Sequence, residues 1–345
     1  MKVTGIGSIE PAGHVAINAA TRRLAIGCVR GLLSRGATEY RLYQLDNMVS
    51  FEKLGFGDAA ICNHLAFDRS GNFLASAEGG PDYFIQGWLY DVAAKRNYVI
   101  RFGGPRGSAQ GGRMGSDFAA FGPAATSLAL SSHWDRPVCV DLQALVGRGE
   151  VNGFALAQKD LYFWSYAWSP DGMTLARVAW TGSRLVYLWR FKNGEQTLAA
   201  DISAQGATFK GPGHEFVGGR VGLAFSPDSR WLAAGPAEAK RGIQVFDAEA
   251  NTLLCESAAL PSPVRVLSFT PGGEFLVSGD DDGNLIVWKL QPEGTPGLTV
   301  VEAEKAPGRL LALSLAQAAD GLYLAHKVTD KVVGVTHVAL PDGVR

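Results

Sequence analysis

Apolar residues recur along the chain in short runs separated by polar turns of four to six residues. The clearest example is residues 223–234, where Leu-Ala-Phe precedes a Ser-Pro-Asp-Ser-Arg turn and Trp-Leu-Ala-Ala follows it. Residues 65–75, 166–176 and 267–277 repeat this arrangement closely. Apolar residues on both sides of a turn rich in Pro, Asp and Gly are typical of two antiparallel strands joined by a hairpin. The pattern therefore predicts a β-hairpin that is repeated along the chain.

The repeat has a period of about 50 residues, and weaker copies at residues 16–25, 119–129 and 313–325 complete it. The leucine of the second strand marks each copy, at Leu24, Leu74, Leu128, Leu175, Leu232, Leu276 and Leu324. Each unit continues into a third strand rich in β-branched and aromatic residues, such as 285–288, and a fourth strand, such as 97–102. One such sheet cannot cover its own apolar faces, whereas sheets stacked around a ring bury them.

These seven units predict an all-β fold, a seven-bladed β-propeller of four-stranded antiparallel blades in a single domain, residues 1–345. The expected blades are 14–56, 57–103, 117–155, 161–204, 220–258, 263–303 and 308–340. The alternative is two α/β domains, since residues 14–33 are rich in Ala, Arg and Leu and have helical propensity. The register of the repeat favours strands there.

Composition and charge exclude several classes of protein. The 345 residues are 47% apolar and 19% charged, which excludes a disordered chain, and 43 glycines agree with many tight turns. A net charge of −1 gives no bulk argument for nucleic-acid binding. Four scattered cysteines lack the paired spacing of a zinc site or a disulfide framework. Without a signal-peptide run or an apolar stretch of about 18 residues, we expect a cytoplasmic protein away from membranes, and we expect no metal or other cofactor.

Residues 278–288, Ser-Gly-Asp-Asp-Asp-Gly-Asn-Leu-Ile-Val-Trp, resemble the repeat of the WD-repeat β-propeller family. The resemblance covers about residues 14–340 and is strongest in units four to six. The family often fixes each blade with a His-Ser-Asp-Trp hydrogen-bond set. Alignment places Ser278, Asp282 and Trp288 at three of those positions as structural, blade-locking residues, with Leu260 where the His would be. At the third-strand aromatic position, unit four has Trp189, and units one, two and five have Tyr43, Tyr90 and Phe246.

The resemblance implies that strands from both termini close the ring, so we expect residues 2–9 to add a strand to the seventh blade, which removes the last open sheet edge.

The resemblance also implies that the longest loops share one face, the top face of the propeller. Loop 103–116 has six Gly, two Arg and no acid, and loop 205–220 carries Lys and Arg as well. Arg and Trp are enriched at binding hot spots because they combine a large contact area with polar groups. The candidate binding residues in the top-face loops are Arg106, Arg113, Trp134, Arg136, Trp180, Arg184, Arg220, Lys240 and Arg241.

Two segments invite other interpretations. Asp280, Asp281 and Asp282 before Gly283 could hold calcium, but alternating acidic ligands are absent and a hairpin turn fits better. Residues 133–137 could form a structural turn, an exposed recognition loop or a catalytic cluster, and Trp180 could serve packing or binding.

No nucleophile or zinc-protease motif occurs in the chain. The favoured function is a non-enzymatic platform, a scaffold or adaptor, that is monomeric alone and binds a protein with an acidic surface. The alternatives are a propeller enzyme or small-ligand binder at the central opening, and an accessory protein that contacts nucleic acid through basic loops.

Overall fold

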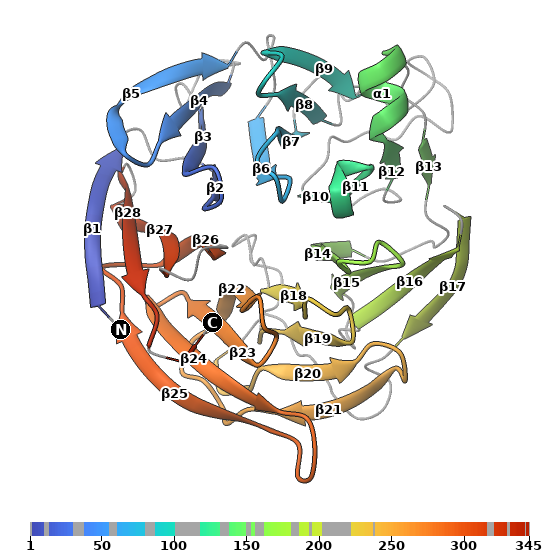
Figure 1. Ribbon diagram of the computed structural model, residues 1–345, viewed down its shortest axis with the longest axis vertical. Coiled ribbons are helices and arrows are strands. Elements are labelled where there is room, and N and C mark those ends of the chain that lie inside the picture. Colours follow the sequence, from blue (N-terminus) through green and yellow to red (C-terminus); the bar gives the residue numbers. More distant parts are fainter. Residues whose placement is uncertain are drawn as a thin grey trace. The chain divides into compact units, whose positions relative to one another are not determined.

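The computed structural model describes most of the chain. The described residues are 2–9, 14–29, 38–54, 61–79, 87–100, 118–131, 138–149, 153–155, 162–180, 186–192, 195–201, 222–236, 239–315, 321–329, 332–341 and 343–344. Their strands form seven four-stranded antiparallel sheets (Figure 1). The predicted all-β fold of a seven-bladed β-propeller is confirmed.

The chain divides into two compact units, and the first, Ile9–Phe163, contains blades 1 to 3. Blade 1 consists of β2 (His14–Asn18), β3 (Arg23–Val29), β4 (Thr38–Gln44) and β5 (Asn47–Leu54). Blade 2 consists of β6 (Ile61–Phe67), β7 (Phe73–Gly79), β8 (Gly87–Asp91) and β9 (Arg96–Ile100). Blade 3 consists of β10 (Phe118–Phe121), β11 (Ser127–Ser131), β12 (Val138–Asp141) and β13 (Gly153–Ala155).

The second unit, Met1–Ser8 with Trp164–Arg345, contains blades 4 to 7. Blade 4 consists of β14 (Tyr162–Trp168), β15 (Thr174–Trp180), β16 (Val186–Lys192) and β17 (Glu195–Asp201). Blade 5 consists of β18 (Leu223–Phe225), β19 (Trp231–Ala234), β20 (Gln244–Asp247) and β21 (Thr252–Glu256). Blade 6 consists of β22 (Val264–Phe269), β23 (Phe275–Asp280), β24 (Asn284–Gln291) and β25 (Gly297–Lys305).

Blade 7 joins the two ends of the chain. Its strand order is β26 (Leu310–Leu315), β27 (Leu322–Thr329), β28 (Val332–Ala339) and β1 (Lys2–Ile9). The predicted closure of the last blade by the N-terminal strand is therefore confirmed. That residues 1–345 fold as one domain stays a prediction.

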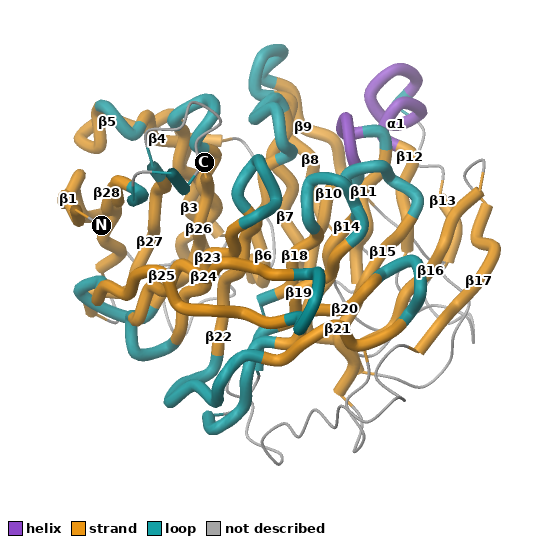
Figure 2. Tube along the Cα trace, turned by 60° about the horizontal axis from the view of Figure 1, so that its bottom comes forward, coloured by secondary structure: helices purple, strands orange, loops and turns teal. Residues whose placement is uncertain are grey.

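Helix is rare in the described part of the chain (Figure 2). Residues 14–18 and 23–29, where local composition favours helix, are β2 and β3. The helix α1 (Leu142–Arg148) and the 3-10 turn η1 (Pro123–Ala125) both lie in blade 3 and were not expected from the repeat. Asp141 begins α1 by accepting a 3.0 Å hydrogen bond from the Ala144 N–H, and Gly149 ends it at φ 72°. These end groups allow two helical turns within the connection between β12 and β13.

The polar turns of the repeat form because their side chains bond to the backbone. In blade 5 the Ser226 hydroxyl donates to Asp228 Oδ1 at 2.5 Å and accepts from the Trp231 N–H at 2.8 Å. Ser169 accepts from the Thr174 N–H in the same way in blade 4, at 2.9 Å. Such side-chain bonds offer the backbone a turn instead of a continued strand. The Ser-Pro-Asp sequences thus fix where each first strand ends and each second strand begins.

The apolar residues of each second strand are buried on both faces of the blade. In blade 5, Leu232 and Ala234 belong to a core cluster with Ala176 and Leu188 of blade 4. Ala233, between them, belongs to a cluster with residues of blade 6. A strand that is buried on both faces is a continuous apolar run rather than an alternating one. This explains the Leu-Ala-Ala sequences that mark the repeat.

One pair of positions recurs in all seven blades, and we call it the lock pair. Its first member lies two residues after the marker leucine on the second strand. Its second member is the third-strand residue that pairs with that leucine. The lock pairs are Ile26–Tyr43, Ser76–Tyr90, Leu130–Val140, Arg177–Trp189, Ala234–Phe246, Ser278–Trp288 and His326–Thr336. All these side chains are buried. The two positions are thus structurally equivalent in every blade, while the residues that occupy them differ in chemistry from blade to blade.

Three lock pairs interact through polar groups. Trp288 Nε1 donates to Ser278 Oγ at 2.8 Å, and His326 Nε2 lies 2.8 Å from Thr336 Oγ1. The Arg177 guanidinium lies 4.1 Å from the centroid of the Trp189 ring. Asp282, aligned with the family's Asp, is exposed, and its N–H donates to Asp280 Oδ1 at 3.0 Å. Leu260, at the position of the family's His, is buried among apolar residues.

Candidate functional site

The predicted binding residues divide into those that the structure describes and those that it does not. Outside the described residues lie Arg106, Arg113, Trp134, Arg136, Arg184 and Arg220. Trp180 is the last residue of β15. Lys240 and Arg241 are described, and both side chains are exposed. The candidate site is therefore built from these two residues and their surroundings in blades 5 to 7.

Lys240 and Arg241 lie at the top end of blade 5, a term we use for the end of a blade that carries two connections. One connection joins the second strand to the third, and the other leads to the next blade. The Lys240 N–H donates to the Leu260 carbonyl at 2.6 Å, and the Leu260 N–H donates to the Arg241 carbonyl at 2.8 Å. These bonds attach the β19–β20 connection to the chain that leads into blade 6. The backbone that carries the two cationic side chains is therefore held in place by hydrogen bonds.

The three carboxylates in the Asp-rich turn of blade 6 have different roles. Asp280 is buried and accepts from the Asn284 N–H at 2.7 Å and from Asn284 Nδ2 at 2.7 Å. Its oxygens thus stabilise the turn, and Asp282 faces solvent. In the described part of the chain, no three His, Cys, Asp or Glu side chains are grouped as a metal site requires. Asp281 has the third role, because it contacts two arginines.

Asp281 contacts one arginine on the first strand of blade 6 and one just before the first strand of blade 7. We call these three residues the Asp281 cluster: Arg265, Asp281 and Arg309. Arg265 Nε donates to Asp281 Oδ2 at 2.9 Å, and Arg309 Nε lies 2.7 Å from Asp281 Oδ1. The side chains are 11%, 23% and 34% exposed, in that order. Partly buried ion pairs are screened less by salt than exposed ones. One carboxylate facing two guanidinium groups leaves one positive charge in the cluster.

Close backbone packing holds the Asp281 cluster in place. Gly283 has φ +83°, and a Cβ there would lie 2.8 Å from the Gly308 carbonyl oxygen. A Cβ on Gly308 would collide with the Lys327 carbonyl oxygen, and the Lys327 N–H donates to the Arg309 carbonyl at 2.7 Å. Glycine is required where backbones approach this closely. The top ends of blades 6 and 7 are therefore one tightly packed layer.

Further exposed groups surround the cluster. Lys305 ends β25 and Val328, near the end of β27, is 47% exposed beside the connection that carries Arg309. Acidic side chains at these top ends are Glu256, Asp282 and Glu304. The Glu256 carboxylate accepts from the Gly242 N–H and from Gln244 Nε2, at 3.3 and 3.2 Å. The result is a rigid, mixed surface with a local positive charge and an exposed apolar side chain.

The arginines of the Asp281 cluster were not among the candidate residues predicted from the sequence. Arg265 is the second residue of β22 and Arg309 immediately precedes β26, so both lie where connections that the repeat register places on the top face meet the first strands. That register was the signal that could have identified them. Their meeting at Asp281 depends on contacts between blades, which sequence spacing does not reveal.

Residues 256–289 match the family model described as "WD domain, G-beta repeat". The chain thus carries one matched WD repeat, in blade 6 of its seven-bladed propeller. The matched residues begin at the end of β21 and run to β24, so they include the approach to blade 6, its first three strands and the Ser278–Trp288 pair. No helix of the described residues is long and apolar enough to cross a membrane.

Solved structures share the propeller fold of this chain. One is a chain in a crystal structure of the mitotic checkpoint complex, with a TM-score of 0.69 and 16% identity over 98% of this chain and 92% of that chain. Another is the β-propeller domain of Cps50 (Swd1) from Myceliophteria thermophila, with a TM-score of 0.64 and 15% identity over 96% of this chain and 99% of that chain. At these identities the likeness shows the fold.

Proposed function

We propose that this protein is a non-enzymatic interaction platform, a scaffold or adaptor, that binds a protein partner through the top ends of its blades. The Asp281 cluster is the observation that carries the proposal. Its guanidinium groups are held by a carboxylate and by close-packed backbone before any partner arrives, which lowers the ordering cost of binding. WD-repeat propellers generally act as protein-interaction scaffolds, and the solved relatives include a chain from a protein complex.

The partner surface that fits this site is acidic. Lys240, Arg241, Lys305 and the cluster supply exposed or half-buried positive charge, and Val328 supplies an apolar contact. Opposite charges across an interface steer association and determine orientation. The proposal extends to the predicted loop residues Arg106, Arg113, Trp134, Arg136, Trp180, Arg184 and Arg220. We also propose that this protein is cytoplasmic and is monomeric without its partner.

Charge reversal at Lys240 and Arg241 tests the proposal. Both side chains are exposed, so Lys240→Glu with Arg241→Glu should keep the fold, since surface substitutions cost within about 0.5 kcal/mol. A matched control reverses two exposed cations elsewhere, Arg69 in the β6–β7 turn and Lys289 in β24. Affinity purification with mass spectrometry identifies the partner, and titration with the purified partner measures affinity. We expect the control to bind as the natural protein does and the Lys240/Arg241 variant to bind more weakly.

Equal binding by the natural protein and the Lys240/Arg241 variant would exclude these top ends as the partner surface. A small molecule that copurifies would instead support a ligand site. Nucleic-acid affinity with a steep dependence on salt would support the nucleic-acid alternative.

A further inference from the structure

Blade 1 has a hollow on its outer strand, in the first unit and independent of the top-end site. In the pairing of β4 with β5, Tyr43 lies opposite Phe51, but Gln44 lies opposite Asn47. Residues 48–50 are therefore outside the register of the sheet. The Asn47 side chain stabilises this bulge, because its Oδ1 accepts from the Val49 N–H at 3.2 Å and its Nδ2 donates to Ser50 Oγ at 3.0 Å. Bulges re-aim side chains and often lie next to functional sites.

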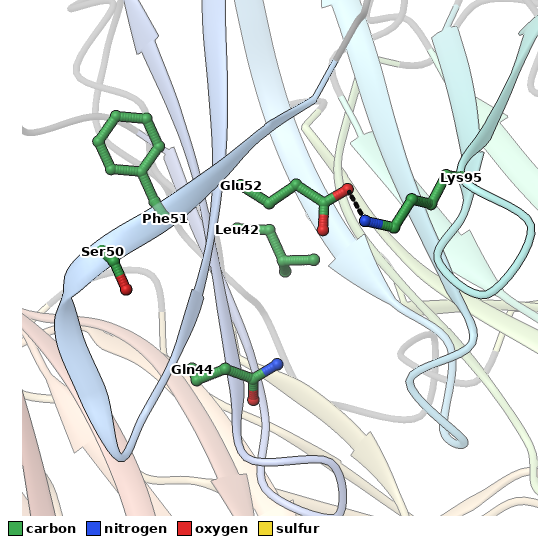
Figure 3. A pocket seen from close by; sticks show the side chains of 6 residues that line it. All are labelled: Leu42, Gln44, Ser50, Phe51, Glu52 and Lys95. Carbon is green, nitrogen blue, oxygen red and sulfur yellow. Dashed lines mark ion pairs between the residues drawn. The ribbon is translucent and has the colours of Figure 1, made fainter.

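The hollow has a volume of about 290 Å³. It is lined by Leu42, Gln44, Ser50, Phe51, Glu52 and Lys95 (Figure 3). Its volume is at the lower limit of about 300–1,000 Å³ for small-molecule sites, which suits one long side chain better than a cofactor. Leu42 is buried and apolar, whereas Gln44 and Ser50 are exposed polar groups. Figure 3 shows Glu52 pointing towards Lys95, which comes from the β8–β9 turn of blade 2.

Glu52 is the fixed charge of the hollow. Its Oε1 accepts from the Tyr90 hydroxyl at 3.0 Å and lies 3.2 Å from Lys95 Nζ. Burial, with the Glu52 hydrogen bond and charge, raises the pKa of Tyr90 to about 12, so this hydroxyl stays a donor at neutral pH. Glu52 Oε2 makes no hydrogen bond or ion pair with the residues that the structure describes. One carboxylate oxygen is therefore available to a ligand.

The charges around the hollow favour a cation as its occupant. Lys95 is 68% exposed, and an exposed ion pair of this kind contributes little stability, so another cation can displace it. An anion at Lys95 would instead approach the Glu52 carboxylate, which Tyr90 holds in place. Gln44 and Ser50 add neutral oxygen acceptors, and Leu42 offers apolar surface to an aliphatic stem. This combination matches the long side chain of Arg or Lys, apolar along its stem and charged at its tip.

Two exposed apolar residues beside the hollow indicate that the cation belongs to a peptide. Val49 is 94% exposed and Phe51 43% exposed, and both lie on β5, the last strand of its sheet. The Phe51 ring is held by Tyr43, at 5.3 Å between centroids, and by the Arg41 guanidinium at 4.6 Å. Edge strands with exposed apolar residues are surfaces on which extended segments dock.

We propose that the hollow at Leu42, Gln44, Ser50, Glu52 and Lys95 binds the basic side chain of an extended peptide segment from a protein partner. The basic side chain enters beside Glu52, and the apolar residues next to it in the segment cover Val49 and Phe51. This surface shares no residue with the Asp281 cluster and takes a partner of opposite charge.

A labelled peptide tests the site. The probe is fluorescein-labelled, amidated Thr-Val-Arg-Val-Thr, whose β-branched residues favour an extended chain. The comparison peptide has citrulline in place of Arg, which keeps the shape and removes the charge. Fluorescence anisotropy at low salt should show saturable binding of the Arg peptide and about tenfold weaker binding of the citrulline peptide, as for one charge-assisted hydrogen bond.

Protein variants locate the binding. Glu52→Gln keeps an acceptor for Tyr90 but removes the charge, and we expect about tenfold weaker binding. Glu293→Gln, at an exposed position in the β24–β25 turn of blade 6, is the control and should bind as the natural protein does. Lys95→Ala removes the competing cation and should bind more tightly, whereas a site for anions would lose affinity. Because Lys95 is exposed, this variant remains informative even if Glu52→Gln lowers the melting temperature.

Three results would overturn the proposal. They are the absence of saturable binding at millimolar peptide, equal affinity for the Arg and citrulline peptides, and weaker binding by Lys95→Ala. None of them bears on the top-end site, because the Lys240/Arg241 variant tests that surface separately.

Discussion

The Ser278–Trp288 lock pair can be converted into the pair that blade 5 already has. Ala234 and Phe246 occupy the same two positions there, and both are fully buried. Ser278→Ala and Trp288→Phe, made singly and together, therefore ask whether the hydrogen bond or the packed shape stabilises blade 6. The bond is 2.8 Å long, and each side chain is 2% exposed, so water does not replace a lost partner.

The expected free-energy changes follow from what each variant leaves behind. Ser278→Ala leaves the Trp288 N–H buried without its acceptor and should lower the free energy of unfolding by about 1–3 kcal/mol. Trp288→Phe removes part of a buried ring and the donor to Ser278, for about 2–4 kcal/mol. The double variant leaves neither polar group unpaired, so mainly the packing loss remains. Its loss should be smaller than the sum of the single losses by roughly 1–2 kcal/mol.

Urea unfolding followed by far-UV circular dichroism measures these changes, because tryptophan fluorescence itself changes when Trp288 is replaced. A control cycle combines Ser278→Ala with Trp189→Phe in blade 4, and its losses should add within about 0.5 kcal/mol. Additive losses for Ser278 and Trp288 as well would refute the reasoning. Shape alone would then account for the stability of the blade.

Three further predictions concern the closure of the ring, stability at low pH and the reactivity of the buried thiols. Deleting residues 1–10 removes β1 and exposes the edge of β28, so we expect aggregation or a large fall in melting temperature, and an unchanged monomer would contradict this. Burial lowers the pKa of His326, so below about pH 6.5 the unfolded chain takes up the proton first and stability falls. The melting temperature should then drop more steeply below that pH for the natural protein than for His326→Gln, and parallel profiles would assign the drop to other groups. Burial raises the pKa of Cys139 to about 12 and of Cys255 to about 11, so iodoacetamide should label them only in urea, as peptide mapping would show.

The fold could be predicted because it depends on apolar residues that recur in one register. Leu232 and its equivalents are buried in every blade, and the Ser-Pro-Asp turns fix the hairpins by local hydrogen bonds. Both signals are short-range and survive in a single sequence. The helix α1 also has local signals, Asp141 and Gly149, but the repeat register offered a strand-only interpretation of that connection.

The candidate sites could be predicted only in part. Lys240 and Arg241 followed from loop register and residue type, whereas the Asp281 cluster depends on side chains from β22, from the β23–β24 turn and from the connection before β26. The hollow of blade 1 depends on a mismatch between two strands, which neither strand shows alone. Polar contacts of this kind are set by register and packing between elements rather than by sequence spacing.

The differences among the lock pairs have a consequence for how the chain assembles. Seven similar units are at risk of pairing the second strand of one with the third strand of another while they fold. Here such an exchange carries a penalty: Ser278 opposite Phe246, or His326 opposite Val140, would bury a polar group with no partner. Unlike pairs therefore act against wrong assembly. The same differences that make the repeats hard to recognise in the sequence therefore favour pairing of strands within one blade over pairing between blades.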